Sequence, residues 1–153
     1  MIGTFHATFL PIPLLLKRIF QQTLAICLLQ GLEIKTAYLQ GIENIKQIYS
    51  QEKYGPELHH FPKILNGEIQ NISIAIIYSS GYVLDTLEPS LWCLLNTVLK
   101  AVNLRKYTDT TGAITGGLAG IYYSIENIPN KWIEIIARKD DIFSLASRLA
   151  TAI

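Results

Sequence analysis

Apolar residues recur at helical spacing along most of this chain, and that periodicity limits the folds open to it. In the second apolar segment the apolar positions follow the order i, i+4, i+7 and i+11, which is one face of an α-helix, and they are Tyr38, Ile42, Ile45 and Tyr49. The segment 14–29 is apolar nearly all round, which predicts a buried helix. Residues 72–78 are rich in β-branched residues, which favour a strand, but no second segment is an obvious partner strand. We therefore expect a loop or short helix there. The pattern predicts an all-α fold.

Residues that typically cap or terminate helices predict where these helices begin and end. Gly31 and Gly55 are suitable C-terminal stops. Asp85 and Glu88 have the spacing of a capping box, which predicts a helix starting at Asp85 with Pro89 in its first turn. Three further helical segments are expected in the last third of the chain, over residues 112–125, 129–138 and 141–152.

Length and composition narrow the class of protein. The 153 residues predict a single helical domain over residues 1–153, long enough to bury a core. Half of the residues are hydrophobic and only 16% are charged, which excludes intrinsic disorder. The net charge of +1 argues against a strongly basic nucleic-acid binder. A chain this apolar either buries almost all of its apolar surface or exposes surface that another chain or segment covers.

The cysteines and the N-terminal sequence indicate the cellular compartment of the protein. Cys27 and Cys93 lie far apart in apolar segments, which favours two buried free thiols over the alternative of one disulfide. The apolar run at residues 9–16 is interrupted by prolines and followed by basic residues, unlike a secretory signal. No apolar run reaches the roughly 18 residues of a membrane helix. We therefore expect a soluble, cytoplasmic protein without membrane or nucleic-acid partners.

The stretch 108–120 (TDTTGAITGGLAG) carries the residues best suited to chemistry. Gly112, Gly116 and Gly120 recur every fourth residue and share one helix face, which suggests that another backbone approaches closely. Asp109 and Thr110 precede them, at the start of the predicted helix. Carboxylate and hydroxyl oxygens are ligands for Mg²⁺, but Asp and Thr are also routine helix caps. Spacing alone leaves both interpretations open and favours the cap.

His59 and His60 are adjacent, and a pair of histidines raises the question of a metal site. Neighbouring side chains on a helix or strand point in different directions. We therefore interpret these residues as a plain surface pair.

Three stretches of the sequence, in this order, resemble the ADP-ribosylglycohydrolase family, which includes the glycohydrolase that activates dinitrogenase reductase. They are residues 80–88 (SGYVLDTLE) with 91–95 (LWCLL), residues 101–104 (AVNL), and residues 108–120. With the flanking helices the resemblance covers about residues 30 to 145. It implies an orthogonal helical bundle, represented here by its C-terminal portion and apparently truncated at the N-terminus.

The resemblance also implies a function. The family hydrolyses the glycosidic bond between ADP-ribose and a protein side chain or related acceptor, with Mg²⁺ as cofactor. By this resemblance Asp109 is catalytic, Asp109 and Thr110 bind metal, and Gly81, Tyr82 and Val83 bind substrate. A core or rim position is the alternative for Tyr82. The implied partner is an ADP-ribosylated protein or an ADP-ribose derivative.

The sequence departs from the family at the metal motif. The motif usually provides two carboxylates one residue apart, and here Tyr107 stands in place of the first. Arg105 and Lys106 add positive charge beside a site for dications, which repels the metal. The N-terminal Thr-Asp-Asp cluster of the family has no counterpart. These differences predict weakened or lost Mg²⁺ binding.

Two hypotheses therefore stand at the level of sequence. The first is a Mg²⁺-dependent ADP-ribosyl hydrolase, if the chain is active, with another chain supplying the remaining ligands. The second is a catalytically inactive remnant, or a helical module that binds ADP-ribose or protein.

Overall fold

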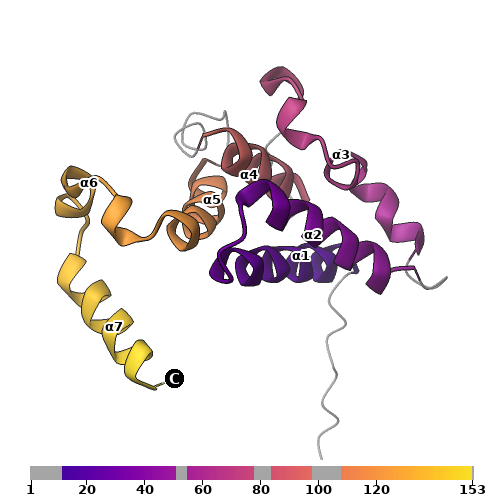
Figure 1. Cartoon of the computed structure of the whole chain (residues 1–153). Coiled ribbons are helices and arrows are strands. Elements are labelled where there is room, and N and C mark those ends of the chain that lie inside the picture. The colour runs from indigo at the N-terminus through magenta and orange to yellow at the C-terminus, as the bar shows by residue number, and fades with distance from the viewer. Residues whose placement is uncertain (1–11, 51–54, 78–83, 98–107, 153) are drawn as a thin grey trace, which may run out of the picture. The chain divides into compact units, whose positions relative to one another are not determined.

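The computed structural model describes residues 12–50, 55–77, 84–97 and 108–152, and within these ranges every regular element is a helix (Figure 1). The predicted all-α class is thereby confirmed. The elements are α1 (Ile12–Leu29), α2 (Ile34–Ile48), the 3₁₀ helix η1 (Gly55–His60), α3 (Pro62–Leu65), the 3₁₀ helices η2 (Ile69–Asn71) and η3 (Ile74–Ile76), α4 (Leu84–Asn96), α5 (Thr108–Tyr123), the 3₁₀ helix η5 (Ile125–Asn127), α6 (Asn130–Glu134) and α7 (Lys139–Ala152).

Helices α1 and α2 form a helical hairpin that carries much of the core. Gly31 ends α1 with a positive φ of 81°, and its N–H donates to Leu28 O, as a glycine stop requires. The rings of Phe20 and Tyr38 meet edge to face at 6.1 Å. A Cβ on Gly41 would lie 3.3 Å from the Phe20 ring, so a hydrogen at this position lets the two helices approach.

The predicted apolar face of α2 is confirmed, because its four apolar positions are all buried: Tyr38, Ile42, Ile45 and Tyr49. The prediction that α1 is buried all round is wrong in part. Leu16, Phe20 and Leu24 are buried, whereas Ile26 and Leu29 are 54% and 72% exposed. Composition shows that a helix is apolar, but only its neighbours decide which of its sides are covered.

Helix α4 packs its leucines into the same core, and Leu87, Leu91 and Leu94 are all buried. It begins at Leu84, one residue before the predicted start, so Asp85 lies in its first turn and Pro89 lies beyond it. The Glu88 carboxylate meets Lys63 Nζ at 2.6 Å, a contact that the capping-box pattern does not foresee. The predicted box is therefore misplaced, because Asp85 lies inside the helix and the Glu88 carboxylate pairs with Lys63.

The segment between α2 and α4 consists of short helical turns. Residues 72–77 form no strand; they include η3, and Trp92 Nε1 donates to Ile72 O at 2.9 Å, so the expected loop or short helix is confirmed. Gly55 does not end a helix as predicted, because α2 already ends at Ile48 and Gly55 begins η1. Cys27 and Cys93 are buried and are not joined by a disulfide, as expected.

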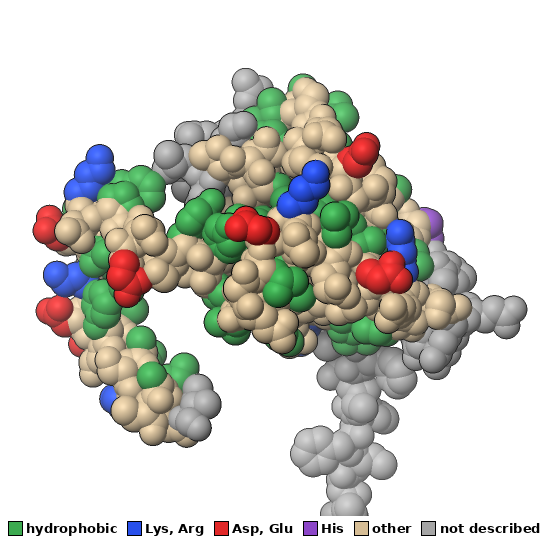
Figure 2. Space-filling view, in the orientation of Figure 1, with side chains coloured by type: hydrophobic (Ala, Val, Ile, Leu, Met, Phe, Trp, Pro, Cys, Tyr) green, Lys and Arg blue, Asp and Glu red, His purple; other side chains and the backbone are tan. Residues whose placement is uncertain are grey.

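Contacts divide the chain into two compact units, Met1–Tyr122 and Tyr123–Ile153. The second unit contains η5, α6 and α7, and none of its described side chains is buried. Figure 2 shows hydrophobic side chains at the surface of this unit. The single domain over residues 1–153 stays a prediction. Among the described helices, none combines the length and apolarity needed to cross a membrane.

Candidate functional site

The predicted metal residues lie in the first turn of α5. This helix begins at Thr108, four residues before the predicted start at Gly112, so Asp109 and Thr110 are helical. Both side chains are exposed, and Asp109 Oδ1 accepts a hydrogen bond from the backbone N–H of Thr110 at 2.8 Å. A carboxylate near the N–H groups of a helix start is electrostatically favourable. Asp109 therefore already satisfies part of the helix end, as the capping interpretation predicts.

Helix α5 has two faces of different character. One face is buried and holds Thr111, Thr115, Leu118 and Ala119. The other face starts at Asp109 and continues through Ala113, Gly116 and Gly120, all of which are exposed. Within the described residues nothing lies within 4 Å of a Cβ built on Gly116 or Gly120. No other backbone approaches these glycines within the described residues, so the described part of the chain leaves this face open, and a close approach by another segment stays a prediction.

The donor set around Asp109 is small. In residues 12–50, 55–77, 84–97 and 108–152 there is no group of three or more His, Cys, Asp or Glu side chains that could hold a metal ion. One carboxylate and one hydroxyl do not make the six-oxygen environment that Mg²⁺ prefers. The described residues therefore do not fit a Mg²⁺ site by themselves. The departures at Arg105, Lys106 and Tyr107 lie outside the described residues.

The predicted substrate segment also lies outside the described residues. Gly81, Tyr82 and Val83 directly precede α4, whose first residue is Leu84. Their predicted role therefore stays a prediction. The structure describes only the residues that follow this segment in the sequence, beginning with the first turn of α4.

A pocket of about 340 Å³ lies beside that first turn. Its lining comes from η1, α3 and α4 and comprises His59, His60, Phe61, Pro62, Lys63, Ile64, Asp85 and Glu88. The His59 and His60 rings are exposed, which confirms the surface pair, but their centroids are only 3.9 Å apart. The expectation that these side chains point apart is wrong, because both end a 3₁₀ helix and their rings tilt together.

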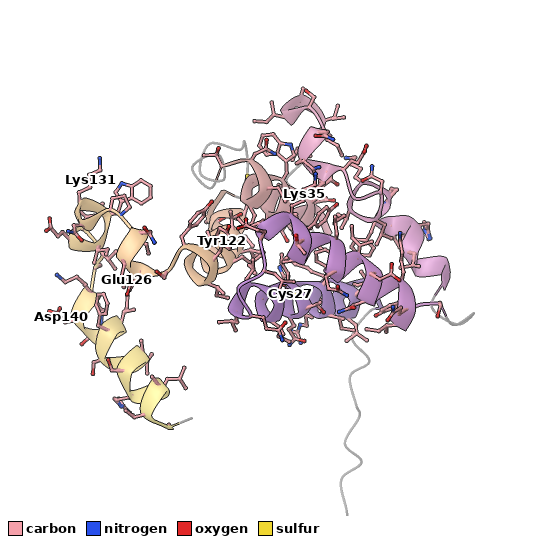
Figure 3. All side chains as sticks on the ribbon, viewed as in Figure 1. Cys27, Lys35, Tyr122, Glu126, Lys131 and Asp140 are labelled. Carbon is pink, nitrogen blue, oxygen red and sulfur yellow. The ribbon has the colours of Figure 1, made fainter. Side chains whose placement is uncertain are left out.

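Tyr122, near the end of α5, connects that helix to the start of α2. Its hydroxyl donates to Glu33 Oε2 at 2.6 Å, across 89 residues of sequence (Figure 3). Within the first unit, this bond links the helix that carries Asp109 to the residue that precedes α2.

A buried lysine contacts the first turn of α4, and the sequence pattern does not predict this contact. Lys17 is only 8% exposed, and its Nζ donates to Thr86 Oγ1 at 2.6 Å. The helical spacing does indicate that Lys17 is buried, because Lys17 lies three residues before Phe20 and seven before Leu24, on the buried face of α1. Lysine and arginine are normally exposed, so a basic residue after an apolar run is expected at the surface, and the burial of Lys17 is therefore not predicted.

Comparison with known proteins identifies the relatives of this sequence. The family model for ADP-ribosylglycohydrolase matches residues 17–153. The chain is 40% identical over 79 residues to the ADP-ribosylarginine hydrolase Tri1 of Serratia proteamaculans (strain 568), a match that covers 48% of this chain and 22% of that protein. It is 40% identical over 95 residues to the ADP-ribosylarginine hydrolase Tri1 of Pseudomonas putida (strain GB-1), covering 58% of this chain and 26% of that protein.

A third relative is the ADP-ribosyl-[dinitrogen reductase] glycohydrolase of Rhodospirillum rubrum, 34% identical over 67 residues, or 40% of this chain and 23% of that protein. The matched segments thus span about a quarter of the length of these relatives, between 22% and 26%. No solved structure matches the chain.

Proposed function

This chain belongs to the ADP-ribosylglycohydrolase family, and from that membership we propose that it acts in removing ADP-ribose from modified protein side chains. The observation that carries the proposal is the family match over residues 17–153, which includes the helix start with Asp109 and Thr110. The reaction class is hydrolysis of a glycosidic bond.

The acceptor that we propose is arginine. Two relatives at 40% identity are named ADP-ribosylarginine hydrolases. In such a reaction the oxygen of water bonds to the anomeric carbon of the ribose while the bond from that carbon to the guanidine nitrogen breaks. The nitrogen takes a proton, and free ADP-ribose and arginine result.

Asp109 is the residue to which we assign the proton transfer. Its carboxylate is exposed at the start of α5 and can accept a proton from an attacking water. Gly81, Tyr82 and Val83 are proposed to contact the nucleotide. We propose Mg²⁺ as a cofactor held in part by Asp109 and Thr110, where it would polarise oxygen atoms. Because the described donors are too few, no step is assigned to the metal.

The second candidate is a helical module that binds ADP-ribose or a modified protein without cleaving it. It is favoured by the small donor set of the described residues. In this case Asp109 acts only on the backbone of its own helix.

Release of ADP-ribose decides between the two candidates. The purified chain is incubated with Mg²⁺ and a peptide ADP-ribosylated on arginine, and free ADP-ribose is quantified by mass spectrometry. We expect release that falls at least about 100-fold in Asp109→Ala, as expected when a proton-transfer group is removed. Asp140→Ala is the matched control, because Asp140 is also an exposed carboxylate in the first turn of a helix, α7 (Figure 3).

Equal release by Asp109→Ala and wild type would remove Asp109 from the reaction. Absence of release by the wild-type chain, with ADP-ribose binding retained in calorimetry, would establish the binding module instead.

A further inference from the structure

Helix α7 (Lys139–Ala152) has an apolar face that the described part of the chain does not cover. Ile142, Leu145 and Leu149 are each more than half exposed, although large aliphatic side chains are usually buried. Figure 2 shows hydrophobic side chains at the surface of the second unit, to which this helix belongs. A helix of 14 residues is marginal in water without a packed face, so α7 is stable only where a partner covers these side chains.

The spacing of these three residues is that of a coiled-coil seam. Ile142, Leu145 and Leu149 lie at i, i+3 and i+7, which correspond to the a, d and a positions of a heptad. By the same count Asp141 and Arg148 both occupy g positions, one heptad apart, and both side chains are exposed beside the seam. Residues at g positions pair with the facing helix in coiled coils, so their charges indicate which helix fits there and in which direction.

The charges beside the seam fit a second copy of the same helix in the antiparallel direction. In an antiparallel pair the g positions of the two helices face each other, which brings Asp141 of each copy beside Arg148 of the other. In a parallel pair a g position faces an e position, and the residue that would face Asp141 is the uncharged Ala146. Antiparallel pairing therefore gives two ion pairs where parallel pairing gives none, and it also aligns the two helix dipoles favourably.

The charge of α7 fits a lipid surface less well. The two basic residues of the helix, Lys139 and Arg148, balance its two acidic residues, Asp140 and Asp141. Helices that lie on membranes are typically rich in Lys and Arg on their polar face, which attracts them to anionic lipids. A helix without net charge lacks that attraction, so a protein partner with both signs of charge is favoured.

We propose that α7 is a self-association surface, through which two copies of this chain pair antiparallel about a twofold axis. The contact is isologous: Ile142 of each copy packs against Leu145 of the other, and Asp141 pairs with Arg148 on both sides. Each helix is about 21 Å long, so the pair buries less than the roughly 1,200 Å² of a standard interface. The dimer is therefore weak, with a dissociation constant on the order of 100 µM, and the chain is mostly a monomer at a few micromolar.

Sedimentation equilibrium of the full chain tests this proposal. The mean mass should rise from 17.2 kDa at about 10 µM towards twice that value at about 500 µM. Leu145→Glu puts a charge into the seam and should weaken association at least about tenfold. Ser147→Glu is the matched control, because it adds the same charge to the same helix at the f position, away from the seam, and should stay within about twofold of wild type. Circular dichroism verifies that each variant keeps its helices.

Charge reversal tests the direction of pairing and the identity of the occupant. Arg148→Asp makes both g positions acidic and leaves the ion pair between Arg138 and Asp141 of the same chain intact. Asp141→Arg makes both g positions basic. Each variant alone should associate at least about fivefold more weakly than wild type, because like charges then face each other. An equimolar mixture of the two variants again places opposite charges together and should associate within about twofold of wild type.

A chain that keeps a mass of 17.2 kDa up to about 500 µM would overturn the proposal, and so would association that Leu145→Glu leaves unchanged. Wild-type association in both charge variants, or a mixture that does not recover, would contradict antiparallel pairing. Flotation with phosphatidylcholine vesicles, with and without phosphatidylserine, tests the lipid surface. Vesicle binding by a monomeric chain that Leu145→Glu abolishes would assign the face to lipid and would also overturn self-association.

Discussion

Helices α1 and α7 have similar patterns of apolar residues but opposite environments. In α1 the side chains of Leu16, Phe20 and Leu24 are all at most 1% exposed. In α7 the apolar side chains at comparable spacing, Ile142, Leu145 and Leu149, are 54%, 64% and 61% exposed. The apolar pattern of a helix therefore predicts which of its faces is suited to burial. Whether that face is buried depends on the elements that pack against it.

The difference in burial between α1 and α7 has a consequence for helix stability. An isolated helix of 14 residues, the length of α7, is marginal in water, because most helical stability in proteins comes from packing an apolar face. The first unit has a core that provides this packing, and the described side chains of the second unit provide none. Substitutions in the two helices should thus have unequal effects.

The largest expected difference is between Phe20→Ala in α1 and Leu145→Ala in α7. Phe20 is fully buried against Gly41 and Tyr38, so its truncation should lower the free energy of unfolding by about 3–5 kcal/mol. Leu145 is mostly exposed, so its truncation should change that free energy by less than about 0.5 kcal/mol. Urea denaturation followed by circular dichroism measures both. A loss above about 2 kcal/mol in Leu145→Ala would mean that α7 is packed in solution.

The next largest effect concerns tyrosines in the two units at alkaline pH. Burial raises the pKa of Tyr38 to about 12, although the Ile69 N–H opposes this shift. An unfolded tyrosine ionises near pH 10, so the unfolded chain releases a proton that folded Tyr38 keeps. The stability that neutral Tyr38 contributes is complete below pH 10 and is lost as pH rises towards 12.

Denaturation at several pH values measures this loss. The free energy of unfolding should fall by about 2 kcal/mol between pH 10 and pH 12, and Tyr38→Phe should remove this part of the fall. Tyr123→Phe is the matched control, because Tyr123 belongs to the second unit and is 46% exposed. An identical pH profile for Tyr38→Phe and Tyr123→Phe would contradict the assignment.

The smallest expected difference is between the two ion pairs. Lys63 and Glu88 meet at 2.6 Å with side chains 39% and 20% exposed, while Arg138 and Asp141 meet at 2.7 Å with side chains 82% and 64% exposed. Double-mutant cycles should give a coupling energy near 1 kcal/mol for the first pair and about 0.3 kcal/mol or less for the second. A stronger coupling in the exposed pair would reverse the order that solvent screening predicts.

Periodicity identified most of the helices, because the apolar faces of α2 and α4 have neighbours that cover them. It placed the start of α5 four residues late, since Thr108, Asp109 and Thr110 lack apolar side chains although they are helical. Asp109 and Thr110 are site candidates through the family resemblance, because their spacing alone favours a helix cap, and their proposed role stays a prediction.

Other contacts of α4 depend on the tertiary structure. Lys63 pairs with Glu88 across 25 residues of sequence, and Lys17 donates to Thr86 across 69 residues. No local pattern contains such a pair, because the two partners approach only after the intervening chain has folded.

The long-range hydrogen bonds also have a consequence for the order of folding. The α1–α2 hairpin is built from nearby residues and can form while the chain is still being synthesised. The partner of Lys17 follows 69 residues later, and that of Glu33 follows 89 residues later. The nascent hairpin therefore emerges with Lys17 hydrated, and this water is removed only when α4 docks.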